Sequence, residues 1–167
     1  MRLFIAVQIT DKMKTAIIGM MHDLKQQGLT GNYVPASNLH MTLAFIGEVQ
    51  SSTAVQEVLR EVPGETFRIA MDGMVTFGDA FCISIKGNQK LKNYTKELRR
   101  QLKARGVPCA DDKFVPHVTL VRKTGGKRPE KLPLIKDECN VTKISLMKSE
   151  QKNGKSVYTE IFSVPVK

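Results

Sequence analysis

The chain has 167 residues, of which 41% are hydrophobic and 25% charged, and its formal net charge is +10. This length suits one domain, over residues 1–167, with a substantial core. No apolar stretch is long enough to span a membrane, and the apolar start at residues 3–7 is too short for the core of a signal peptide, so we expect neither a membrane-spanning nor a signal segment in this sequence.

The first half predicts a strand over residues 2–8, a helix capped by Thr10, a strand over residues 39–46 and a second helix that Pro63 ends. The inward face of the first helix carries Met13, Ile17, Met20, Met21 and Leu24, and that of the second carries Val55, Val58, Leu59 and Val62. His22 falls on the outer side of the first helix and is expected at the surface.

The second half predicts two strands around residues 67–71 and 81–85, a helix over residues 88–105 and a strand after Pro116. A basic loop is expected at residues 122–128, followed by a terminal hairpin with its turn at Asn153-Gly154. The third helix presents an inner face of Leu91, Tyr94, Leu98 and Leu102 and an outer face of Lys92, Lys96, Arg99, Arg100 and Lys103. We expect this outer face to be solvated, with RNA contact as the less favoured alternative.

Hairpin signals and mixed connections in this order of elements indicate an α+β fold with largely antiparallel sheets. One short motif occurs in each half of the chain, which suggests two similar lobes. The motif is His-apolar-Thr-Leu, at His40-Met41-Thr42-Leu43 and again at His117-Val118-Thr119-Leu120.

Side chains two residues apart on a strand share a face. We therefore expect His40 and Thr42 to point one way and Phe45 the other, and His117 to point with Thr119. Histidine titrates near neutral pH, so one imidazole can accept a proton while the other donates one. The hydroxyls can hold phosphate oxygens, and this combination suits hydrolysis of a phosphodiester.

Arg122 follows the second motif and would favour an anion, but strict alternation places it opposite His117. It can contribute only if the strand twists, bulges or ends there. A metal site is disfavoured because two histidines alone leave zinc short of ligands. Cys109 has no feature of a nucleophile beyond its nearness in sequence to His117.

The three cysteines, Cys82, Cys109 and Cys139, are an odd number without C-x-x-C spacing, which favours a reducing compartment and predicts a cytoplasmic protein. The basic balance favours an anionic partner, with nucleic acid as the first candidate.

Both motifs and their flanks resemble the 2H phosphoesterase superfamily, and most closely its RNA 2′,3′-cyclic phosphodiesterase, or 2′-5′ RNA ligase, branch. The similar segments are the start Met1-Arg2-Leu3-Phe4-Ile5-Ala6-Val7, the stretch from Leu39 to Glu48, the stretch from Phe114 to Arg122, and Ser145-Leu146-Met147-Lys148-Ser149. Two positions depart from the branch, because Val34 and Ala44 stand where members often carry a basic residue.

The resemblance implies a bilobal, pseudo-symmetric fold in which two mostly antiparallel sheets line a central cleft and helices pack outside. It implies hydrolysis of a 2′,3′-cyclic phosphate at an RNA or nucleotide 3′ end to a 2′-phosphate. His40 would give a proton to the leaving 3′ oxygen, His117 would activate water, and Thr42 and Thr119 would bind phosphate oxygens. No metal or other cofactor is implied, and we expect a monomer. Two alternatives stay open: a module that binds RNA or nucleotide ends with little turnover, and 2′-5′ RNA end-joining.

Overall fold

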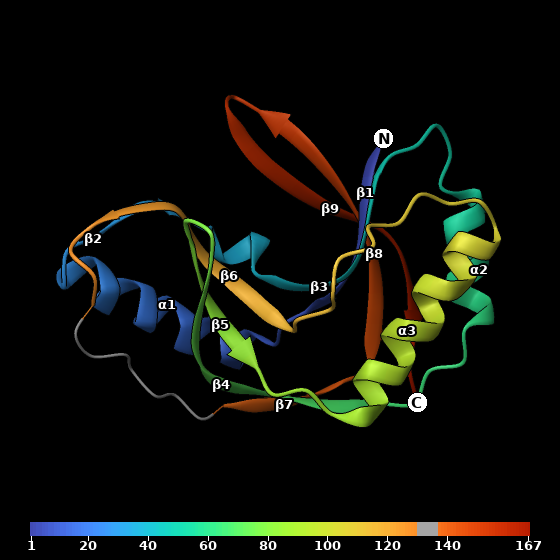
Figure 1. The fold of residues 1–167 in the computed structure, drawn as a ribbon, viewed down its shortest axis with the longest axis horizontal. Coiled ribbons are helices and arrows are strands. Elements are labelled where there is room, and N and C mark those ends of the chain that lie inside the picture. Colours follow the sequence, from blue (N-terminus) through green and yellow to red (C-terminus); the bar gives the residue numbers. More distant parts are fainter. Residues whose placement is uncertain (130–136) are drawn as a thin grey trace.

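Two antiparallel sheets and three α-helices make up the part of the chain that the computed structural model describes, residues 1–129 and 137–167 (Figure 1). The four-stranded sheet has the order β3 (His40–Glu48), β1 (Arg2–Gln8), β8 (Lys143–Lys152) and β9 (Lys155–Pro165). The five-stranded sheet has the order β2 (Leu29–Tyr33), β6 (His117–Gly126), β5 (Ala80–Ile85), β4 (Phe67–Phe77) and β7 (Glu138–Val141). The expected α+β architecture of two antiparallel sheets is confirmed.

The helices are α1 (Asp11–Gln26), α2 (Thr53–Glu61) and α3 (Gln89–Ala104). Each predicted inward face is buried, and the Thr10 hydroxyl accepts a hydrogen bond from the Met13 amide at 3.3 Å, which caps α1 as expected. A short 3-10 turn (Ala36–Asn38) precedes β3. In Figure 1, α1 lies beside β2 of the five-stranded sheet, whereas α2 and α3 lie together beside the four-stranded sheet.

Connections between the sheets are frequent. The chain leaves the four-stranded sheet after β1, returns to it at β3, leaves it again after β3 and returns at β8, which makes four passages. Apolar side chains from both sheets and all three helices form one continuous core. The two motif strands β3 and β6 come from different sheets and lie against each other across this core.

Two parts of the sequence interpretation need correction or completion, and a third agrees with the structure. The predicted basic loop at residues 122–128 is wrong over most of its length, because residues 122–126 continue β6 and pair with β2. Strands β2 and β7 were not predicted, since each is short and has a single buried residue. The terminal hairpin is confirmed, with Asn153 and Gly154 both at positive φ, the geometry that this residue pair favours.

Candidate active site

The two motifs share a backbone irregularity that the alternation rule does not contain. In β3, Ile5 pairs with Ala44 and Ala6 with Thr42, so Leu43 is an extra residue without a partner on β1. In β6, Leu120 is the extra residue, because Phe81 pairs with Val121 and Cys82 with Thr119.

Each bulge changes which residues face the cleft. Beyond a bulge the side chains of a strand exchange faces. Leu43 and Ala44 are therefore both buried, as are Leu120 and Val121, and the residue five positions after each histidine returns to the side of that histidine. These residues are Phe45 and Arg122, which both line the pocket at His40. The expectation that Phe45 points away from the cleft is wrong, and the bulge that Arg122 requires is present.

The two histidine rings are held in the same way. His40 Nδ1 lies 2.7 Å from the Asn38 carbonyl oxygen, and His117 Nδ1 lies 2.6 Å from that of Val115. A carbonyl only accepts, so each Nδ1 carries the hydrogen, and in the neutral ring each Nε2 is a base. A phenylalanine ring packs at a tilt against each imidazole. The ring centroids of Phe4 and His40 are 4.8 Å apart, and those of Phe77 and His117 are 4.5 Å apart.

The surroundings of the two rings nevertheless differ. His40 Nε2 is 2.9 Å from Thr42 Oγ1, and Tyr158 meets the ring edge-on at 5.3 Å between centroids. Burial is the main cause that lowers the pKa of His40; the charges of Arg122 and His117 lower it further, and the bond to Asn38 opposes them. Thr42 lines both the pocket that contains His40 and Arg122 and the pocket that contains His117, so residues of both motifs border one space.

Thr119 occupies the position in its motif that Thr42 has in the first. The buried Cys82 thiol donates a hydrogen bond to its hydroxyl oxygen at 3.7 Å. Burial raises the pKa of Cys82, which keeps the thiol protonated and able to donate. The hydroxyl hydrogen of Thr119 is then available for another acceptor.

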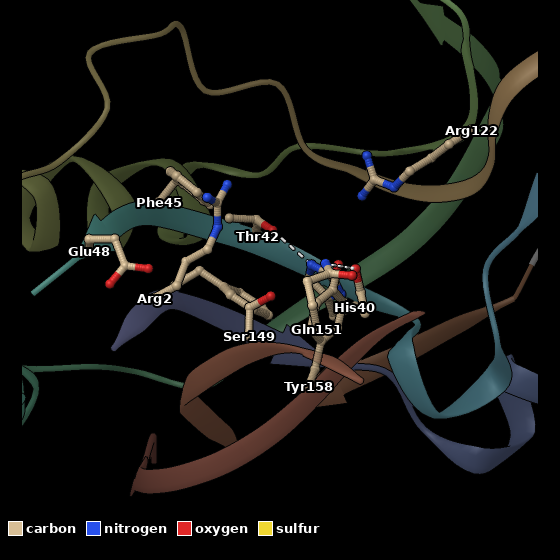
Figure 2. Close-up of a pocket in the computed structure, with 11 residues that line it drawn as sticks. Arg2, His40, Thr42, Phe45, Glu48, Arg122, Ser149, Gln151 and Tyr158 are labelled. Carbon is tan, nitrogen blue, oxygen red and sulfur yellow. Dashed lines mark hydrogen bonds between the residues drawn. The ribbon is translucent and has the colours of Figure 1, made fainter. Parts of the chain in front are cut away.

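The space around the motifs consists of two adjoining pockets. The larger, about 700 Å³, contains His40, Thr42 and Arg122, with Arg2 and Tyr158 among its other lining residues (Figure 2). Figure 2 shows Arg122 on the opposite wall from Arg2, with its guanidinium directed into the space between them. The smaller pocket, about 380 Å³, contains His117, and both pockets are lined by Thr42 and Phe45.

Several lining residues were not predicted from the sequence. Arg2, Phe4, Ser149, Gln151 and Tyr158 come from β1, β8 and β9, which neighbour β3 or one another only after the sheet has formed. Arg99 lines the smaller pocket, so its expected place on the solvated face of α3 is wrong.

No group of three or more His, Cys, Asp or Glu side chains in the described part of the chain is arranged to hold a metal ion. Nor is any helix in that part both long and apolar enough to cross a bilayer.

Comparisons with known proteins identify the family and a similar fold. A family model described as the 2′-5′ RNA ligase superfamily matches residues 15–153. A protein of Aquifex aeolicus named RNA 2′,3′-cyclic phosphodiesterase is 31% identical over 157 residues, which cover 83% of this chain and 82% of that one. One of Thermotoga maritima with the same name is 29% identical over 131 residues, covering 73% of this chain and 70% of that one. The fold superposes on the crystal structure of E. coli LigT complexed with 3′-AMP with a TM-score of 0.86 at 24% identity, over 99% of this chain and 97% of that one.

The fold and the paired motifs define a 2H phosphoesterase, an enzyme of the phosphodiesterase class. The chain belongs to the 2′-5′ RNA ligase superfamily.

Proposed function

We propose that the protein hydrolyses 2′,3′-cyclic phosphates at RNA or nucleotide 3′ ends to 2′-phosphates, with His40 and His117 as its acid and base. The observation that carries the proposal is the paired geometry of the histidines, whose Nδ1 atoms are both fixed by carbonyls two residues earlier. Two relatives that bear the name of this activity cover most of the chain and add support.

The proton on His40 controls what Thr42 can do. In the neutral ring, Nε2 accepts the hydrogen of the Thr42 hydroxyl, whereas a protonated Nε2 donates to it. Protonation of His40 therefore frees the Thr42 hydrogen for a phosphate oxygen. Thr119, which accepts from Cys82, offers its own hydrogen at the same time. The two hydroxyls then stabilise the charge that develops on the phosphate oxygens.

The substrate must favour the protonated form of His40, because burial and Arg122 lower the pKa of this group in the free protein. The negative charge of a cyclic phosphate between the motifs supplies this effect, since a nearby anion raises the pKa of an imidazole. The Nε2 proton of His40 then passes from its bond with Thr42 Oγ1 to the leaving 3′ oxygen, while Nε2 of His117 takes a proton from the attacking water. Arg122 contributes by binding the anion.

Part of the positive charge on and next to α3 is compensated, which supports the cleft as the place where the anionic partner binds. On α3, Arg100 pairs with Glu97 and Lys103 with Asp111, and Arg105, directly after the helix, pairs with both Glu57 and Glu61. Arg2 and Arg122, in contrast, line the pocket that contains His40. We propose that RNA with a cyclic phosphate end, or a cyclic nucleotide, binds there to a monomeric protein.

The test is incubation with a nucleoside 2′,3′-cyclic phosphate, with and without EDTA, followed by identification of the product. We expect the 2′-monophosphate at the same rate in both conditions. No turnover, a 3′-monophosphate product or a requirement for added metal would each contradict the proposal. An RNA pair with compatible ends, supplied in the same experiment, separates hydrolysis from 2′-5′ end-joining.

A further inference from the structure

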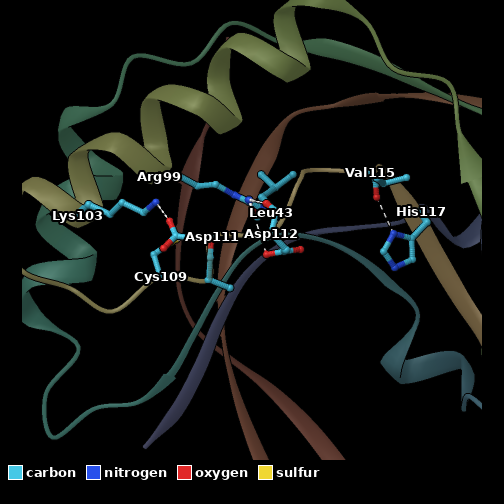
Figure 3. Close-up of polar contacts among 9 residues, drawn as sticks. Leu43, Arg99, Lys103, Cys109, Asp111, Asp112, Val115 and His117 are labelled. Carbon is cyan, nitrogen blue, oxygen red and sulfur yellow. Dashed lines mark hydrogen bonds and ion pairs between the residues drawn. The ribbon is translucent and has the colours of Figure 1, made fainter. Parts of the chain in front are cut away.

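Arg99 connects the two motifs although it belongs to neither. It lies on α3, and only 16% of its side chain is exposed. Its Nε donates a hydrogen bond to the Leu43 carbonyl at 2.9 Å, and its Nη1 donates one to the Asp112 carbonyl at 2.7 Å (Figure 3). Figure 3 shows the side chain reaching from the helix towards both backbone segments.

The first acceptor belongs to the bulge of the first motif. Leu43 is the extra residue of β3, so its backbone has no partner in the register with β1. A buried carbonyl that the ladder leaves unpaired requires another donor. Arg99 supplies it with a charged N–H. Because Leu43 directly follows Thr42, the bond to Arg99 anchors β3 immediately after the residue that carries the hydroxyl.

The second acceptor belongs to the segment that leads into the second motif. Asp112 lies five residues before His117, and the Val115 carbonyl between them holds the His117 ring. The same segment is tied to β3 by the Ala110 amide, which donates to the Phe45 carbonyl at 3.0 Å. The approach to His117 is thus anchored on the strand that carries His40.

The chemistry of the anchor requires arginine. One planar guanidinium makes both bonds at once, and it also lies 5.5 Å from the centre of the Phe114 ring and 3.9 Å from an Asp112 carboxylate oxygen. A lysine ammonium has no fixed fork and cannot reproduce this pair of directions.

We propose that Arg99 is a positioning residue that fixes the two histidine motifs relative to each other by binding the Leu43 and Asp112 carbonyls. The proposal rests on the proposed function, because the value of this spacing lies in transferring two protons to one phosphodiester. It assigns Arg99 no contact with the substrate. Misplacement of reacting groups by about 1 Å costs on the order of a hundredfold in rate.

The experiment compares Arg99→Lys and Arg99→Gln with wild type on a nucleoside 2′,3′-cyclic phosphate, at a temperature well below the Tm of each variant. Arg100→Gln is the matched control, since Arg100 neighbours Arg99 on α3 but pairs with the exposed Glu97. We expect kcat per folded molecule to fall by about ten- to a hundredfold in both Arg99 variants, with KM changed less than about threefold. The control should match wild type in both constants.

Each other result has a definite meaning. A lower Tm with kcat unchanged, or loss of folding in both Arg99 variants, would overturn the proposal in favour of a purely structural role. A rise in KM with kcat unchanged would overturn it in favour of substrate binding. A wild-type protein without turnover would instead refute the proposed function.

Discussion

The buried side chain of Asn38 should affect both stability and catalysis. Its side-chain amide nitrogen donates to the Ser156 carbonyl on β9 at 2.8 Å, and the backbone carbonyl of Asn38 accepts from His40 Nδ1. The residue is 8% exposed. Asn38→Ala removes the bond to β9 and releases the segment whose backbone carbonyl orients the His40 ring.

The magnitude follows from the bond that is lost. A hydrogen bond whose acceptor stays partly buried is worth about 1–2 kcal/mol. At about 2.1 cal/mol/K per residue, unfolding of the 167-residue chain has an entropy of about 0.35 kcal/mol/K, so Tm should fall by about 3–6 °C. Because the ring loses rigidity, kcat on a cyclic nucleotide should fall about tenfold with little change in KM.

Calorimetry and steady-state kinetics on three variants test this reasoning. Asn38→Asp is nearly isosteric but places a carboxylate against a carbonyl, so its Tm should fall below that of Asn38→Ala. Ser37→Ala is the control, because Ser37 is the exposed neighbour of Asn38, and it should match wild type. If Asn38→Ala kept both the Tm and the kcat of wild type, the argument that this amide fixes the segment whose backbone carbonyl binds His40 would be refuted.

Three further predictions concern the site itself. His40→Ala and His117→Ala should each lower kcat by about a hundredfold to ten-thousandfold while far-UV circular dichroism stays native, and near-normal turnover in either would contradict the acid–base pair. The kcat/KM of wild type should rise and fall with pH, and the descending limb follows loss of the proton on His40. Arg122→Gln removes a cation that disfavours the imidazolium, so this limb should move to higher pH, and an unmoved limb would argue against their coupling. Binding of an oligoribonucleotide with a cyclic phosphate end should weaken more steeply with salt than binding of a cyclic mononucleotide; Arg122→Gln should reduce that slope, Arg100→Gln should not, and the opposite order would move the RNA to α3.

The lowered pKa of His40 also has a consequence for stability. A histidine whose pKa is depressed by folding binds a proton more readily in the unfolded chain. Neutral His40 therefore contributes to the free energy of unfolding above the ordinary histidine pKa of about 6.5. This contribution is lost as the pH falls from there through the lower pKa of His40 in the folded protein.

The sequence predicted those features that depend on local pattern. The helix α1 is an example, because a hydroxyl at Thr10 and a five-residue apolar stripe determine where it begins and which face it buries. The two motifs were visible as candidate site segments for the same reason, since two copies of one His-apolar-Thr-Leu pattern are informative without any knowledge of the fold.

The features that were missed depend on which strands become neighbours. The bulges at Leu43 and Leu120 are visible only in the pairing with β1 and β5, and they decide that Phe45 and Arg122 face the cleft. Arg99 looked like one more cation on a polar helix face, because its acceptors are backbone carbonyls far away in sequence. Side-chain periodicity carries no information on such partners.

The four passages of the chain between its sheets bear on how substrate enters. A cleft between independently mobile lobes opens by bending at a few linker residues. Here the walls of the cleft are joined by repeated crossings and by one core that runs through both sheets. Bending the lobes apart would strain several connections together and expose buried apolar surface. We therefore expect a rigid cleft that is open before substrate binds and that releases product without a hinge movement.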